Sequence, residues 1–244
     1  GLLSNLFNWK LIYMVSAVFM LILAWMLKSR LPGVPLMKMS YFSIFKSMLS
    51  LLQSERRLMF RSLIGGFAFA AMSILFSTIA MLLTSEPFKL PDVMVGVSTL
   101  IGVFGALSTT KIGKIADRGY THILTWIGVT VLAISWGFLY YGGQFLISYI
   151  LGYGIISFGL AIVHSSNQNI IFRLHAKAKS RINAIYMTTY FIGGACGSAL
   201  GVYAWHHGGW SMTCITGLSL VAGAALFALL DTICVQKQQH TQIP

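Results

Sequence analysis

Basic residues alternate with apolar runs along this chain, and this alternation limits the possible folds more than any other feature. Fifteen of the seventeen Lys and Arg residues lie in every second gap between long apolar runs or on the tail. The runs span residues 11–27, 59–83, 93–110, 122–141, 144–163, 183–205 and 211–230. Each is near the ~20 apolar residues that a helix needs to cross a bilayer. The sequence therefore predicts an all-α membrane protein with seven transmembrane helices.

The distribution of positive charge predicts the orientation, because basic residues gather on the cytoplasmic side of a membrane. They follow the first, third and fifth runs and end on the tail: Lys28, Arg30, Lys38, Lys46, Arg56, Arg57, Arg61; Lys111, Lys114, Arg118; Arg173, Lys177, Lys179, Arg181; Lys237. The chain should enter from outside, cross seven times and end in the cytoplasm. Apart from His164, no charged side chain is expected clearly within a span.

Composition excludes several classes of protein. A net charge of +12 would suggest nucleic acid as the partner of a soluble protein, but only 9% of the residues are charged. Attraction to anionic lipid explains the charge, so membrane lipid is an expected partner and nucleic acid is not. The three cysteines have no metal-ligand spacing, and the pair His206–His207 lacks a third ligand. No metal or other cofactor is predicted.

The gap after the third run carries a recognisable motif. Gly113, Asp117, Arg118 and Gly119 are spaced as in the cytoplasmic-loop signature of the major facilitator superfamily, which the chain resembles. The match departs from the family where Gly119 directly follows Arg118 and where Tyr120-Thr121-His122 replaces a basic cluster. The resemblance implies a gate held by the Asp117 carboxylate, paired with a helix N-terminus or with an arginine such as Arg181. The alternative is a solvated loop that only sets topology.

The resemblance extends over essentially the whole chain. It implies that residues 1–27 form the last helix of an N-terminal half and that 28–58 form a cytoplasmic linker. Apolar positions between residues 41 and 52 recur every 3.6 residues, which predicts an amphipathic helix in this linker. Residues 59–230 would form the C-terminal six-helix bundle and 231–244 a cytoplasmic tail. Family members have two six-helix halves with substrate between them, so helices one to five are an expected partner.

The most polar stretch of any run begins at His164. His164, Asn167 and Gln168 lie at positions i, i+3 and i+4, on one helix face. Polar groups at membrane depth usually face a cavity or a neighbouring helix. This face is the candidate site for substrate and proton binding, because histidine titrates near neutral pH. The alternative is that these side chains join helices or lie at the inner interface.

Gly193, Gly197 and Gly201 form two consecutive GxxxG steps, which predict a close approach of another helix. Packing within the chain and a homodimer contact both fit this face.

These observations predict a secondary active transporter of a small organic solute. The resemblance is to bacterial inner-membrane efflux members, which implies proton-coupled export by alternating access. The alternative is a transport-inactive remnant of a split or truncated gene. An enzyme is not predicted, because no HExxH, GxSxG or paired-carboxylate pattern is present and no catalytic residue stands out.

Overall fold

The computed structural model describes residues 9–30, 40–175 and 178–241, and in these residues the chain is helical between short turns. The helices are α2 (Trp9–Arg30), α3 (Tyr41–Ser54), α4 (Arg56–Thr84), α5 (Asp92–Ser98), η1 (Thr99–Gly102), α6 (Val103–Ile115), η2 (Ala116–Tyr120), α7 (Thr121–Tyr141), α8 (Leu146–Leu174) and α9 (Lys179–Thr241). Residues 31–39 of the predicted linker lie outside the described residues.

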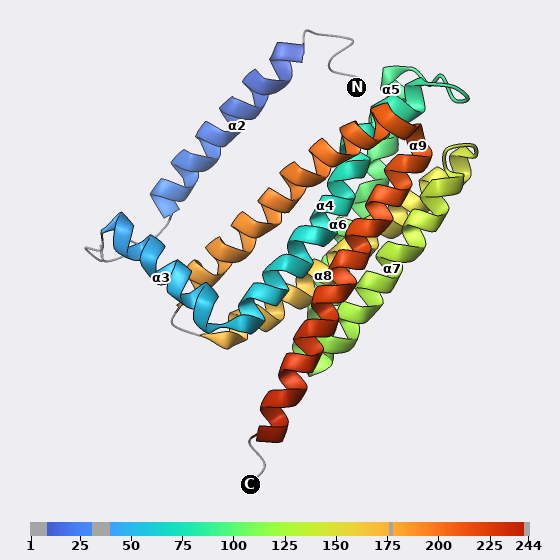
Figure 1. The fold of residues 1–244 in the computed structure, drawn as a ribbon. Helices are drawn as coiled ribbons and strands as arrows, with labels where there is room; N and C mark the ends of the chain where they lie inside the picture. The colour runs from blue at the N-terminus through green and yellow to red at the C-terminus, as the bar shows by residue number, and fades with distance from the viewer. Residues whose placement is uncertain (1–8, 31–39, 176–177, 242–244) are drawn as a thin grey trace.

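Five helical stretches are long and apolar enough to cross a membrane, and two of them reverse direction at glycine. Gly119 (φ 97°) separates α6 from α7, and Gly208 with Gly209 (φ 61°) divides α9 into two limbs. Positive φ values favour glycine, because it has no Cβ atom. Figure 1 shows the orange limb of α9 rising and the red limb returning beside α4. The described chain therefore contains seven membrane-length limbs, and the predicted all-α fold is confirmed.

The core lies where α4, α7, α8 and α9 meet. Leu75, Leu132 and Ile156 are fully buried there, and Trp136 is 1% exposed. The Trp136 ring packs so closely on α9 that a Cβ atom at Gly217 would collide with it. Large apolar side chains of one helix thus fit against small residues of the next, which holds these helices in fixed register.

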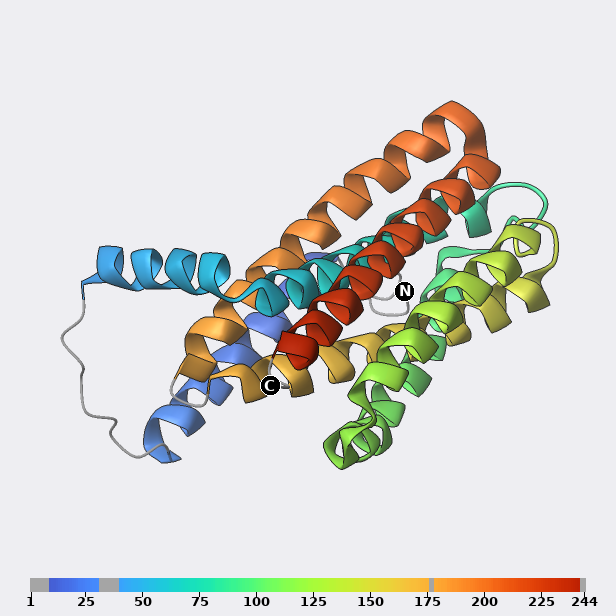
Figure 2. The ribbon, with the colours of Figure 1, turned by 60° about the horizontal axis from the view of Figure 1, so that its bottom comes forward.

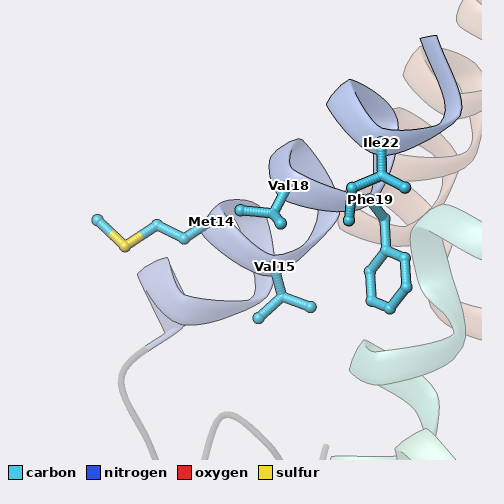
Figure 3. A pocket seen from close by; sticks show the side chains of 5 residues that line it. All are labelled: Met14, Val15, Val18, Phe19 and Ile22. Atoms are coloured by element: carbon cyan, nitrogen blue, oxygen red, sulfur yellow. The ribbon is translucent and has the colours of Figure 1, made fainter. Parts of the chain in front are cut away.

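Helix α2 stands apart from this bundle in the view of Figure 1. None of its membrane-length window is buried by the rest of the described chain. A shallow hollow of about 210 Å³ on its surface is lined by Met14, Val15, Val18, Phe19 and Ile22, all from α2 itself (Figure 3). A polar solute would find no hydrogen-bonding side chain there, so this apolar face fits lipid or other helices better.

Helix α3 lies at the end of the bundle where α4 begins and extends to one side of it (Figure 2). Met48, Leu51 and Leu52 pack against a cluster formed by α4, α8 and α9. Phe42 and Phe45 remain 79% and 70% exposed. The helix therefore has one apolar face on the protein and a second one that is uncovered.

Candidate functional site

An open cavity of about 520 Å³ lies between α4, η1, α6, α8 and the first limb of α9. It is lined by Met72, Phe76, Thr99, Gly102, Val103, Gly105, Thr109, Tyr153, Ser157, Leu160, Ala161, His164 and Tyr190. Four membrane-length helical segments therefore contribute to one concave wall: α4, η1 with α6, α8 and the first limb of α9. A cavity of this volume accommodates a small organic molecule.

His164 is the ionisable imidazole on this wall. Its Nδ1 atom lies 3.1 Å from the hydroxyl oxygen of Tyr186, which is fully buried. The imidazole also packs 5.1 Å, centroid to centroid, from the ring of Tyr190. His164 precedes the end of α8 at Leu174 by ten residues, or about 15 Å along the helix, half the thickness of a bilayer core. The structure therefore places a hydrogen-bonded histidine near the expected midplane and on the cavity wall.

The other two residues of the predicted polar face are placed differently. Asn167 is fully buried, and its Oδ1 atom accepts a hydrogen bond of 3.4 Å from Arg61. Gln168 is half-buried, and neither residue is part of the cavity lining with His164. The three positions share one side of α8, and of the three only His164 is among the described residues that line the cavity.

Arg61 and Asp231 form a buried ion pair that the sequence analysis missed. Arg61 is 1% exposed and Asp231 is fully buried. The guanidinium donates to the Asp231 Oδ2 atom from Nε (3.0 Å) and Nη2 (2.5 Å). Its Nη1 atom donates to the Thr125 hydroxyl at 2.6 Å. We expected no charged residue other than His164 clearly within a span, and this expectation was wrong. Helix α4 already begins at Arg56 and carries Arg61 into the bundle.

This ion pair joins four helices near one end of the bundle. Arg61 belongs to α4, Thr125 to α7, Asn167 to α8 and Asp231 to α9. Arg57, on the same helix as Arg61, adds a second positive charge 3.6 Å from Asp231. One signal in the sequence could have revealed the pair: Arg61 lies within the apolar run 59–83, and Asp231 directly follows the last apolar run.

The motif loop is tied to α8. The Asp117 carboxylate accepts a hydrogen bond of 2.5 Å from the Asn169 amide, and Arg173 donates to the Asp117 backbone oxygen at 3.2 Å. No ion pair joins Asp117 to Arg181 among the residues that the structure describes. Gly119 makes the turn at φ 97°, whereas a Cβ atom at Gly113 would meet open space. The motif thus fastens the end of α6 to the end of α8.

Comparison with known proteins decides the family. The sequence matches the Major Facilitator Superfamily over residues 1–198. The chain belongs to the major facilitator superfamily. It is 37% identical to the uncharacterized transporter YgaY of Escherichia coli O157:H7 over 90% of this chain and 56% of that protein. It is 26% identical to the uncharacterized MFS-type transporter YybF of Bacillus subtilis, over 84% and 51% of the two chains. The chain spans about half the length of these curated relatives.

The glycine face of this major facilitator chain lies against α4. A Cβ atom at Gly193, Gly197 or Gly201 would collide in turn with Gly66, Ala70 and Ile74. The GxxxG steps therefore let the backbones of α4 and α9 approach within the same chain. Because Tyr190 stands on the same limb of α9, this contact also sets how far that ring lies from the α4 side of the cavity.

Proposed function

We propose that this chain forms the seven C-terminal helices of a secondary transporter that moves a small organic solute across the bacterial inner membrane. The observation that carries the proposal is the position of His164, a hydrogen-bonded histidine on the wall of a cavity near mid-membrane depth. Substrate sites of secondary transporters lie near the bilayer midplane between two halves. The opposite wall would come from helices one to five, which are the expected partner of the exposed helix α2.

Coupling to protons would use the His164–Tyr186 hydrogen bond. A neutral imidazole can accept at Nδ1 from the tyrosine hydroxyl, whereas a protonated one donates from both ring nitrogens. Gain of a proton therefore changes the hydrogen bond to Tyr186 on α9 and the group presented to a solute. Proton-coupled efflux follows if protonation at Nδ1, which disrupts the bond from Tyr186, weakens binding of the solute to the same wall, since each then drives release of the other.

The inner gate would be the contact between Asp117 and α8. The hydrogen bond from Asn169 and the bond from Arg173 hold the ends of α6 and α8 together. Opening toward the cytoplasm requires these ends to separate, so the contact favours the closed inner side. The short motif loop, with Gly119 at its turn, suits such a hinge.

Orientation and lipid contact follow from charge. The inner ends carry Arg56, Arg57 and Lys46, and we place them, with the C-terminus, in the cytoplasm. The uncovered face of α3, with Phe42 and Phe45, would rest on the inner leaflet of the membrane, where aromatic rings and lysine suit the interface.

The test is solute-driven proton movement in everted membrane vesicles that contain the complete protein. His164→Gln keeps a polar group beside Tyr186 but removes titration near neutral pH. It should abolish the pH dependence of transport between about pH 5.5 and 8, the range in which histidine changes charge. The matched control is His207→Gln, an exposed residue at the outer end, which should leave that dependence unchanged. An unaltered pH profile in His164→Gln would remove this residue from the coupling mechanism. Absence of any solute movement by the parent protein would favour the inactive remnant.

A further inference from the structure

The cavity wall combines aromatic rings with uncharged polar groups. Its thirteen lining residues include Phe76, Tyr153 and Tyr190, but no Asp, Glu, Lys or Arg. A charged group on a solute would therefore lose hydration without finding a counter-ion on this wall. Rings on the wall, in contrast, offer large apolar faces and edges to another ring. The lining favours an uncharged aromatic portion of a solute.

The rings are held in place before any solute arrives. Tyr190 stacks on Phe69 with the ring centroids 4.1 Å apart and the planes inclined by 13°. Tyr153 lies nearly parallel to Tyr149, at 6.1 Å and 6°. Phe76 meets Tyr153 edge-on, at 6.4 Å and 77°. Side chains fixed in this way lose little rotamer freedom on binding, which favours affinity for a rigid planar ligand.

Three aliphatic hydroxyl groups of the wall already donate their protons to the backbone. Ser157 donates to the Tyr153 backbone oxygen at 2.9 Å, and Thr109 donates to the Gly105 backbone oxygen at 3.2 Å. Thr99 donates to the Gly96 oxygen at 2.6 Å. The remaining lone pairs of these three hydroxyl groups can accept a hydrogen bond from a solute that carries a donor. With Nδ1 engaged by Tyr186, Nε2 is the His164 nitrogen left to a solute.

We propose that this wall binds uncharged aromatic solutes that carry a hydrogen-bond donor, of which phenols are the simplest class. The ring packs on Phe76, Tyr153 and Tyr190, while the phenolic O–H donates to a wall hydroxyl and its oxygen accepts from His164. This inference rests on the proposed function, because it assigns a ligand class to the same cavity. The assigned ligand class adds a prediction that the transport function alone does not make. The aromatic ring of the solute and its hydrogen-bond donor should each contribute to affinity.

The test is equilibrium binding to the complete protein in lipid nanodiscs, with empty nanodiscs subtracted. 1-Naphthol is the fluorescent probe, and the other compounds compete with it. Decahydro-1-naphthol lacks the aromatic ring, 1-methoxynaphthalene lacks the donor, and 1-naphthoate adds a charge. The first two should each bind about 2- to 12-fold more weakly than 1-naphthol, the range expected for one aromatic contact or one neutral hydrogen bond. 1-Naphthoate should bind more weakly still, because its carboxylate loses hydration on entering the cavity.

Matched variants locate the site. Phe76→Leu removes a ring that is 49% exposed, so it should fold and should weaken 1-naphthol binding about 2- to 12-fold. Phe158→Leu, at a ring on α8 outside the lining, should leave binding unchanged. Ser157→Ala should weaken 1-naphthol but not 1-methoxynaphthalene. Equal binding by the two leucine variants, or equal affinity for the saturated alcohol, would overturn the inference.

Transport assays separate this inference from the function on which it rests. Selective binding of 1-naphthol without its movement across the membrane would refute the transport function and leave the ligand class standing. Equal transport of 1-naphthol and its saturated analogue, with no preference in binding, would refute the ligand class and leave transport standing.

Discussion

The buried ion pair between Arg61 and Asp231 yields the sharpest prediction about stability. Asp231→Asn removes the negative charge and keeps the shape of the side chain. Arg61 would then remain 1% exposed without a counter-ion, and Arg57 would face it without the carboxylate between them. Hydrogen bonds to Thr125 and Asn167 would persist, but these neutral partners do not balance the charge.

The expected loss follows from the geometry. Two hydrogen bonds, of 3.0 and 2.5 Å, join the guanidinium to one carboxylate oxygen of Asp231. Breaking a fully buried pair by removing one partner costs about 3–5 kcal/mol, because a charge is left buried and unpaired. Arg57→Gln is the control, since Arg57 is 30% exposed and lies 3.6 Å from the carboxylate. That change should cost less than about 1 kcal/mol.

The assay is unfolding of the purified complete protein in mixed micelles of a mild detergent and SDS, followed by circular dichroism. A double variant, Arg61→Met with Asp231→Leu, removes both charges and should recover most of the stability lost in Asp231→Asn. Comparing the single and double variants isolates the interaction between the two residues. If Asp231→Asn costs no more than Arg57→Gln, or if the double variant is no more stable than Asp231→Asn, the pair does not stabilise the bundle as argued.

Two further predictions test the helix contact and the gate. Gly197→Ala should destabilise the bundle by about 1–3 kcal/mol, because the added Cβ atom would collide with the α4 backbone. The control is Gly137→Ala, in open space on α7, which should be neutral or stabilising by up to about 1 kcal/mol. Unfolding in the same micelles measures both changes in stability. Asp117→Asn should weaken the hydrogen bond from Asn169 and so favour opening of the proposed gate. The rate at which a thiol reagent labels Cys234, at the proposed inner end, should rise by about fivefold. A labelling rate equal to that of the control Asp92→Asn, at the proposed outer side, would count against the gate.

Hydropathy was sufficient to predict the helices because each crossing must bury its backbone polar groups within one apolar segment. The run predicted at 122–141 corresponds to α7, Thr121–Tyr141, almost residue for residue. Where α9 reverses, Gly208 and Gly209 lie in the gap between the predicted runs 183–205 and 211–230. The motif around Asp117 identified the family, since glycine and charge at an inner turn are conspicuous in a chain with few charges.

The division of the polar face on α8 could not be predicted from spacing alone. His164 and Asn167 lie one turn apart, so helical periodicity places them together. Their neighbours differ, because His164 meets Tyr186 and the cavity whereas Asn167 meets Arg61. Which helix covers each turn depends on tertiary packing, and the partner Arg61 is more than a hundred residues away in the sequence.

The separation of charge from the cavity has a physical consequence for coupling. The ion pair lies where four helices meet, and there Arg61 finds both a carboxylate and neutral acceptors. The cavity wall, in contrast, carries no Asp, Glu, Lys or Arg among its described lining residues. A buried pair that is hydrogen-bonded to two further helices resists rearrangement, so it suits a fixed brace between helices better than a moving part. On this wall, His164 is the side chain of the type that changes charge near neutral pH. Its bond to Tyr186 is the contact through which such a change would reach α9.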